Sequence, residues 1–261
     1  HLTIGSGRLI EQDFTRIEND IESGEFFKNS SLCQALNDTN KNDKAVHILG
    51  LLSDGGVHSH QNHIHAILEL AKQQGCKQVY FHVITDGRDT PPNSAGEFVK
   101  LLQEKINELQ IGRIVSLVGR FYAMDRDNRW ERVSKAYRLI SSGKSERQAD
   151  SPISAIQMAY EAGETDEFIA PTSVGKSVMI NEGDAVIFMN YRADRAREIT
   201  QALTSSTFQE FERESFNAPN FICLTEYKKD FNLECAYPPI TVVNTLGYYL
   251  SSLGLKQLRI A

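Results

Sequence analysis

Charged and polar side chains follow four apolar runs of this sequence, at the point where each run ends. These loops carry Asp54 and His58 after residues 45–52, Arg88 and Asp89 after residues 78–85, Arg120 and Arg126 after residues 113–118, and Arg192 and Arg195 after residues 184–189. The planar fork of an arginine matches two oxygens of a carboxylate or phosphate at once. Loops of this composition favour the binding of a small anionic ligand.

The apolar runs are typical of buried parallel strands. After the first run, Gly55 and Gly56 allow a tight turn, and residues 60–72 carry Ile64, Ile67 and Leu68 at helical spacing. A strand, a glycine turn and a helix begin a βαβ unit. In open α/β sheets ligands bind at the carboxyl ends of the strands, so we expect the charged loops to meet there.

The rest of the chain predicts more helices than strands. We expect helices at residues 11–23, 25–36, 130–140, 152–162, 194–203 and 245–252, and a short strand at residues 221–224. Ser151 and Pro152 suit the start of the fourth of these segments, and Asp127 or Asn128 would cap the third. The polar stretch 228–239 ends in two prolines and is interpreted as a linker.

The composition limits the classes of function. The 261 residues are 41% hydrophobic and 24% charged, with a net charge of −6, which argues against a nucleic-acid partner. The four cysteines form no CxxC pair, and no apolar run approaches the length of a membrane span. We therefore expect a cytoplasmic protein with no membrane partner. The start at His1 and the abrupt end suggest a cut through a longer protein.

Several long motifs resemble one family. They are Ser53-Asp54-Gly55-Gly56-Val57-His58-Ser59-His60, Asp86-Gly87-Arg88-Asp89-Thr90-Pro91-Pro92, Gly119-Arg120 with Tyr122 and Met124-Asp125-Arg126-Asp127, Thr165-Asp166-Glu167-Phe168, and Asn190 with Arg192, Asp194 and Arg195. In this order they resemble cofactor-independent (2,3-bisphosphoglycerate-independent) phosphoglycerate mutase.

The resemblance implies an architecture. It implies a three-layer α/β/α sandwich with a mostly parallel sheet, the phosphotransferase domain inserted into an alkaline-phosphatase-like enzyme. Residues 10–227 would form this substrate-holding domain, residues 1–9 would be a remnant of the phosphatase domain, and residues 228–261 would be a linker and a second remnant.

The resemblance also implies an activity. The full-length enzyme would be an isomerase of glycolysis and gluconeogenesis that interconverts 3-phosphoglycerate and 2-phosphoglycerate through a phosphoserine, without a bisphosphoglycerate cofactor. The serine and the ligands of two manganese ions would lie in the missing phosphatase domain, the partner of this chain within one polypeptide. We expect a monomer, and we expect this chain alone to be inactive.

The family's site residues carry over by position. Arg192 and Arg195, expected on one face of a helix start, would hold the phosphate. Arg88, Arg120 and Arg126 would hold the carboxylate and the glycerate. Asp89 would transfer protons and His58 would contact the migrating oxygen, so these two are the expected catalytic residues, with no metal ligand in this chain.

Other interpretations of the same residues remain open. His58, His60, His63 and His65 could ligate the metal of a hydrolase, although their spacing does not repeat one helical interval. Asp54 could be a turn residue, and Arg129 and Arg132 could form surface ion pairs. Asp125, Asp127 and Asp194 could orient arginines or cap helices. A module that only binds other proteins is a third alternative.

Overall fold

The core of the protein is one sheet, described by a computed structural model that covers residues 2–7, 10–214 and 216–258. The strands within these residues are β1 (Val46–Leu51), β2 (Val79–Thr85), β3 (Arg113–Gly119), β4 (Arg147–Ala149), β5 (Thr172–Val174), β6 (Ala185–Phe188), β7 (Asn220–Thr225) and β8 (Glu234–Tyr237). They form an eight-stranded sheet in the order β4-β5-β3-β2-β1-β6-β7-β8. The expected α/β fold with a mostly parallel sheet is confirmed.

The direction of the strands changes only near one edge. β1 pairs in parallel with both β2 and β6, and the parallel pairing continues through β3 on one side and through β7 and β8 on the other. β5 runs antiparallel to β3 and parallel to β4. From β1 the sheet continues through β2 and β3 on one side and through β6 and β7 on the other, so β1 marks a topological switch point. At such a point a crevice forms at the carboxyl ends of the strands.

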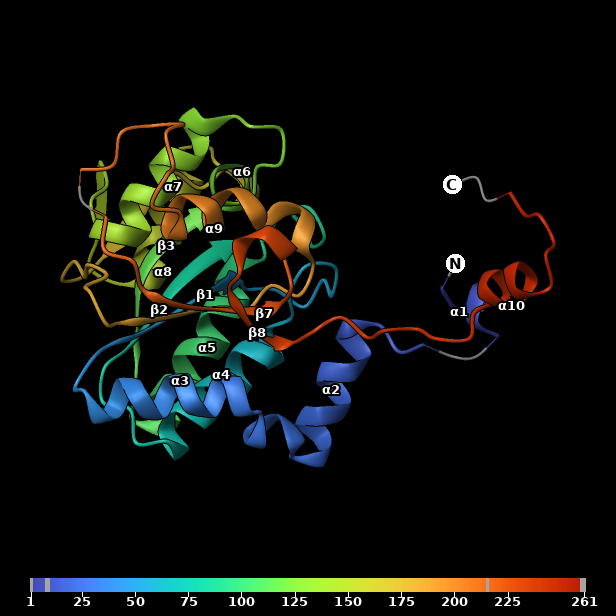
Figure 1. Ribbon diagram of the computed structural model, residues 1–261. Coiled ribbons are helices and arrows are strands. Elements are labelled where there is room, and N and C mark those ends of the chain that lie inside the picture. The colour runs from blue at the N-terminus through green and yellow to red at the C-terminus, as the bar shows by residue number, and fades with distance from the viewer. Residues whose placement is uncertain (1, 8–9, 215, 259–261) are drawn as a thin grey trace.

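Helices cover both faces of the sheet (Figure 1). Those described are α1 (Leu2–Ser6), α2 (Asp13–Ser23), α3 (Ser30–Lys41), α4 (Gln61–Gln73), α5 (Ala95–Leu109), α6 (Arg120–Ala123), α7 (Trp130–Ser142), α8 (Pro152–Glu161), α9 (Arg197–Thr204) and α10 (Leu246–Ser252), with 3-10 turns η1 (Glu25–Lys28), η2 (Asp166–Phe168), η3 (Ala193–Arg195) and η4 (Lys229–Phe231). One apolar cluster joins α2, α3, α4, α5 and α8 to the sheet, and a second joins α6, α7 and α9 to its other face. The two clusters make the three-layer sandwich.

Local sequence explains the boundaries of these elements. β1 is buried at every position because helices pack on both of its faces. At α8 the Ser151 hydroxyl accepts the Ser154 N–H and the Ser154 hydroxyl accepts the Ser151 N–H, with proline in the first turn. That predicted cap is confirmed. The cap predicted at Asp127 or Asn128 for α7 is wrong, since the N-cap position is Arg129.

The sequence interpretation missed three short strands. β4 and β5 were not expected, and β8 lies inside the segment interpreted as a linker. Cys223 of β7 pairs with Cys235 of β8, and Ala236 and Tyr237 are buried. The prediction that a linker begins at residue 228 is therefore wrong for the residues up to Tyr237, because β8 in this segment completes the sheet.

The two ends of the described chain lie beside each other, away from the sheet. α1 contacts α10, and Figure 1 shows both helices joined to the rest of the molecule by two extended segments. Where these segments leave the sandwich, Arg16 Nη1 donates to the Pro238 carbonyl at 3.1 Å. Residues 1, 8 and 9 of the expected remnant 1–9 lie outside the described residues. None of the described helices combines the length and apolar composition that crossing a bilayer requires.

Candidate functional site

The charged loops leave the sheet at the carboxyl ends of β1, β2, β3 and β6. Several hydrogen bonds join β1 and its loop to the loop after β6 across the switch point. The Leu51 N–H donates to Asn190 Oδ1 at 3.0 Å, and the Tyr191 N–H donates to the His58 carbonyl at 2.9 Å. His58 is thereby fixed at the point where the fold favours ligand binding.

A buried ion-pair network connects the loops after β2 and β3. Arg120 Nη1 lies 2.7 Å from Asp86 Oδ1 and 2.6 Å from Asp89 Oδ2, and the Ser53 hydroxyl donates to Asp86 Oδ2 at 2.7 Å. Burial alone would raise the pKa of Asp86. The N–H of Asp89, the Ser53 hydroxyl and the Arg120 guanidinium outweigh that effect, so the pKa lies below its usual value. Arg120 therefore holds Asp89 in place from within the protein.

Glycines let the loops approach backbone to backbone. A Cβ added at Gly55 would lie 2.9 Å from the Cβ of Asp89. Gly87 has φ +68°, and a Cβ there would lie 2.7 Å from the backbone nitrogen of Glu167. A Cβ at Gly119 would overlap the Glu167 carbonyl. The left-handed turn at Gly87 thus packs the loop after β2 against η2.

His58 is a buried and uncharged histidine. Its Nδ1 lies 3.7 Å from Asp194 Oδ1, and its side chain is 4% exposed. Burial and the positive charge of Arg120 lower its pKa to about 4, against the opposite influence of Asp194 and Asp89. At neutral pH the ring can accept or donate a hydrogen bond without carrying a charge.

Asp194 orients arginines from two loops. Its Oδ1 lies 3.0 Å from Nε of Arg192, and its Oδ2 lies 3.1 Å from Nη1 of Arg126. Both arginines are about half exposed, at 51% and 49%. Asp194 is thus placed to orient Arg192 of its own loop and Arg126 of the loop after β3.

The sequence predicted that Arg192 and Arg195 lie on one face at the start of an α-helix. This prediction is wrong. Arg192 is the extended residue before η3, Arg195 ends that 3-10 turn, and α9 begins only at Arg197. The Ala196 N–H bonds the Ala193 carbonyl at 3.0 Å, which closes a turn tighter than α-helical. The Arg195 side chain is held separately, with Nη1 donating to the Met124 carbonyl at 3.0 Å.

The arginines of three loops share one electrostatic neighbourhood. Burial lowers the pKa of Arg195, and the positive charges of Arg126, Arg120 and Arg88 lower it further. Arg88 is 57% exposed and lies 3.4 Å from Glu167 Oε1. These side chains, with Arg192, are named here the arginine cluster. Mutually repelling guanidinium groups beside the uncharged His58 favour an anion with more than one negative charge.

The histidines do not converge on one metal. His58 faces the arginine cluster, whereas His63 Nε2 lies 2.9 Å and His60 Nδ1 lies 3.6 Å from Glu18 Oε1 on α2. Within the described residues Glu18, His60 and His63 are the group that could hold a cation, and His65 is not part of it. His63 Nδ1 has no partner there, although metal-bound histidines usually donate from the second nitrogen. This separation argues against the four-histidine hydrolase.

The remaining sequence interpretations have simple outcomes. Asp54 is exposed. Arg129 and Arg132 lie 3.3 Å and 3.7 Å from Asp125 Oδ1, so the predicted ion pairs are confirmed. Asp127 also lies 2.5 Å from Arg129 Nη1.

The sequence interpretation assigned no role to several residues that build the site. Asp86 and Ser53 were quoted only as members of motifs, although Asp86 is 2% exposed and binds Arg120. Asp166 receives the N–H groups of Ser94 and Ala95 at 2.8 and 2.9 Å, and its carbonyl accepts the Thr85 hydroxyl. A carboxylate within a glycine turn was the available signal for Asp86.

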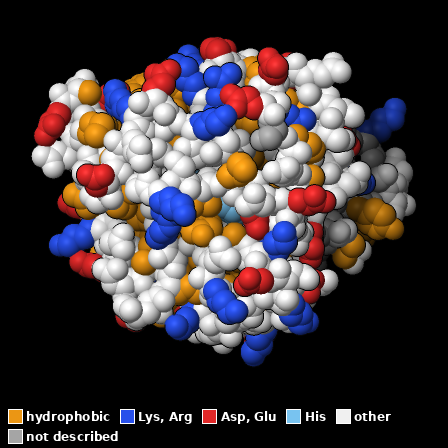
Figure 2. Space-filling model, turned by 90° about the vertical axis from the view of Figure 1, so that its left-hand side faces the viewer, with side chains coloured by type: hydrophobic (Ala, Val, Ile, Leu, Met, Phe, Trp, Pro, Cys, Tyr) orange, Lys and Arg blue, Asp and Glu red, His pale blue; other side chains and the backbone are white. Residues whose placement is uncertain are grey.

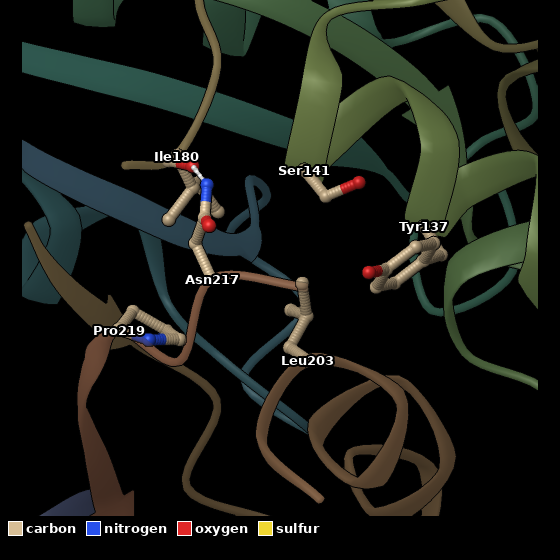
Figure 3. Close-up of a pocket in the computed structure, with 6 residues that line it drawn as sticks. All are labelled: Tyr137, Ser141, Ile180, Leu203, Asn217 and Pro219. Carbon is tan, nitrogen blue, oxygen red and sulfur yellow. Dashed lines mark hydrogen bonds between the residues drawn. The ribbon is translucent and has the colours of Figure 1, made fainter. Parts of the chain in front are cut away.

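A small cavity elsewhere in the fold has no part in this site. Figure 3 shows it between α7, α9 and the loop before β7, with the Asn217 side chain bonded to the Ile180 carbonyl. Its volume of about 10 Å³ suits roughly one water molecule.

On the face in Figure 2, acidic and basic side chains alternate with scattered hydrophobic ones. The chain as a whole has a net charge of −6, so the arginines at the strand ends are a local positive feature.

The fold and the cluster define an α/β protein that gathers arginines at a topological switch point. Comparison with known sequences then places it. The family described as "BPG-independent PGAM N-terminus" matches residues 17–229, and the chain belongs to that family. The resemblance inferred from the motifs is confirmed.

Similar proteins carry the same description. The chain is 56% identical, over its whole length, to the 2,3-bisphosphoglycerate-independent phosphoglycerate mutase of Vesicomyosocius okutanii, and 50% identical to that of Ectopseudomonas mendocina. It covers 51% of each, so the chain spans about half the length of these relatives. A Leishmania mexicana phosphoglycerate mutase crystallised at low cobalt concentration matches with a TM-score of 0.86 and 29% identity, over 97% of this chain and 49% of that one.

Proposed function

We propose that this chain is the substrate-holding part of a phosphoglycerate mutase that interconverts 3-phosphoglycerate and 2-phosphoglycerate. The observation that carries the proposal is the arginine cluster, whose guanidinium groups come from separate loops. Asp194 contacts His58, Arg192 and Arg126, and Arg120 contacts Asp89. Phosphoglycerate has a phosphate and a carboxylate on a three-carbon body, so several arginines can each bind one of its anionic groups.

The roles follow from what each side chain is free to do. Arg192 and Arg195 would bind the phosphate, and Arg88 and Arg126, both about half exposed, would bind the carboxylate. Arg120 would contribute its charge while holding Asp89. Asp89 would exchange a proton with the glycerate hydroxyls. His58 would hydrogen-bond the migrating oxygen, which its uncharged ring allows.

The rest of the reaction would need protein beyond this chain. A cluster of guanidinium groups does not fit a divalent cation, so the two manganese ions proposed from the family would bind elsewhere, together with the serine nucleophile. We propose that the other half of the longer relatives' length corresponds to a phosphatase domain that supplies them. The whole protein would be a cytoplasmic, monomeric enzyme of glycolysis.

The domain division is proposed with one change. Because β8 completes the sheet, the substrate-holding domain would extend from residue 10 through Tyr237 instead of ending at residue 227. Residues 1–9 and those after Tyr237, which include α1 and α10, would then belong to the second domain.

Calorimetric titration of the purified chain with 3-phosphoglycerate tests the proposal. We expect weak binding by the wild type and none by the double variant Arg192→Ala plus Arg195→Ala. Arg138→Ala is the matched control, because Arg138 is exposed on α7. A coupled assay of the same wild-type protein should show no interconversion of the two phosphoglycerates. Equal binding by the wild type and the double variant would contradict the proposed site.

A further inference from the structure

Glu198 is a buried carboxyl group in the first turn of α9, behind the arginine cluster. It is 7% exposed. Its Oε1 accepts the Asn128 N–H at 2.9 Å, whereas its Oε2 has no hydrogen-bond partner among the described residues. The single bond links α9 to the loop of residues 125–129. A buried carboxyl oxygen without a partner calls for a physical reason.

The neighbour of Glu198 is a second buried carboxylate. Asp125 is 4% exposed, and its Oδ2 accepts the N–H groups of Asp127 and Arg129, both at 2.9 Å. The charged groups that face Glu198 are Asp125 and Asp127, with Arg129 of the same loop and Arg132 of α7 paired to Asp125. Both basic residues therefore neutralise Asp125 and leave Glu198 without a cation of its own.

The two carboxyl groups differ in their affinity for a proton. Burial raises the pKa of Glu198 to about 7, and the charges of Asp125 and Asp127 act in the same direction, against the bond from Asn128. Burial also acts to raise the pKa of Asp125, but its bonds from Arg129 and Asp127 hold it below the usual value. A protonated Glu198 can donate to the Asp125 carboxylate. An ionised Glu198 instead repels it.

The loop between these carboxyl groups carries Arg126. Three contacts fasten the loop and its start to η3 and α9: Arg126 to Asp194 at 3.1 Å, Arg195 to the Met124 carbonyl at 3.0 Å, and Asn128 to Glu198. Asn128 has φ +58°, a left-handed conformation that asparagine adopts more readily than most residues. Glu198 therefore sets the position of the loop that carries Arg126, a member of the arginine cluster.

We propose that Glu198 is a positioning residue for Arg126: its protonated carboxyl joins α9 to the 125–129 loop, and its ionisation loosens that loop and weakens anion binding. The proposal rests on the proposed function for the identity of the anion. Ionisation lowers affinity because the loop then loses the bond that a protonated Glu198 can donate to Asp125, and the two carboxylates repel each other. Affinity for the anion should fall as the pH rises through neutrality.

The test compares wild type with Glu198→Gln, which keeps the shape, can accept the Asn128 N–H and can donate to Asp125, but cannot ionise. Calorimetry with 3-phosphoglycerate at about pH 6 and about pH 8 measures the affinity of each protein. The ratio of the two proteins' affinities at one pH does not depend on the ionisation of the ligand, because the ligand is the same for both. We expect a ratio near one at the lower pH. At the higher pH we expect roughly tenfold weaker binding by the wild type. Glu210→Gln is the exposed control and should follow the wild type.

Nuclear magnetic resonance of the ligand-free protein separates this inference from the proposed function. The Asn128 amide and the Arg126 Nε–H should both titrate with a midpoint of about 7 in the wild type and stay constant in Glu198→Gln. A constant Arg126 signal in the wild type, or equal pH dependence of the two proteins, overturns the positioning role. Absence of binding by the wild type at every pH would instead count against the proposed ligand, and the Arg126 signal would still decide the coupling.

Discussion

Nη1 of Arg120 lies 2.7 Å from Oδ1 of Asp86, and these side chains are only 3% and 2% exposed. The pair joins the loops after β2 and β3, and the same nitrogen reaches Asp89. Arg120 therefore differs from the half-exposed arginines around it, because its charge is part of the structural support of the site.

Replacing Arg120 should cost far more stability than replacing Arg126. Arg120→Ala leaves the buried Asp86 without its cation, and breaking such a pair costs about 3 to 5 kcal/mol. Arg126→Ala breaks a pair that is 49% exposed on the arginine side, and such pairs contribute less than about 1 kcal/mol. Urea unfolding of the two variants measures the difference. Equal losses would show that the Asp86 pair is not structural.

His58 should titrate far below the usual range of a histidine. Its ring signals should show a midpoint of about 4 by nuclear magnetic resonance. In Asp194→Asn the midpoint should fall further, because Asp194 raises this pKa. A midpoint near 6.5 in the wild type would mean that the ring is more exposed to water than the structure shows.

The same shift affects stability in acid. The unfolded chain binds a proton to this histidine below about pH 6.5, whereas folded His58 resists protonation until about 4. Between these values the unfolded state holds more protons, so the free energy of unfolding rises with pH across this window. His58→Gln should flatten that part of the profile, measured by urea unfolding at a series of pH values. An unchanged slope would assign the acid sensitivity to other groups.

Two glycine-to-alanine changes should have opposite effects. Gly87→Ala meets a left-handed backbone and the nitrogen of Glu167 at 2.7 Å, so we expect a loss of about 2 to 3 kcal/mol. Gly96→Ala in α5 meets nothing within 4 Å, and alanine should stabilise that helix by about 0.5 to 1 kcal/mol. Thermal unfolding of both variants gives the comparison. A harmless Gly87→Ala would mean that η2 can move away from the turn.

Binding of 3-phosphoglycerate should depend strongly on salt. The arginines of the cluster attract a dianion mainly through charge, and the half-exposed ones are screened by ions. Raising the ionic strength from about 0.01 to about 0.15 M should weaken binding several-fold, as measured by calorimetry in sodium chloride. Affinity that does not change with salt would indicate recognition by hydrogen bonds to buried groups instead.

The sequence predicted the centre of this fold better than its edges. β1, β2 and β3 are apolar runs buried between two helical layers, so composition alone reveals them. β4 and β5 have three residues each, and β8 is only partly apolar. Such short strands form because a neighbour is already in place, which a local pattern does not contain.

The candidate site shows the same division. Arginines at strand ends were visible in the sequence, but the bond from Arg120 to Asp86 joins residues that only the sheet brings together. The histidines illustrate the opposite case. His58 and His60 are close in sequence, yet the first faces the arginine cluster and the second faces Glu18 of α2. Partners that come from another element of the fold decide what these side chains can do.

The contact of α1 with α10 determines how mechanical force would enter this molecule. Tension applied through the two ends would first separate that pair of helices and then reach Arg16 and Pro238, where the extended segments leave the sandwich. Behind Pro238 lies β8, an edge strand bonded only to β7 within the sheet. Tension at the C-terminal end would therefore load the sheet at its β8 edge, whereas tension on α2 would reach the loop after β1 through the contacts of Glu18 with His60 and His63.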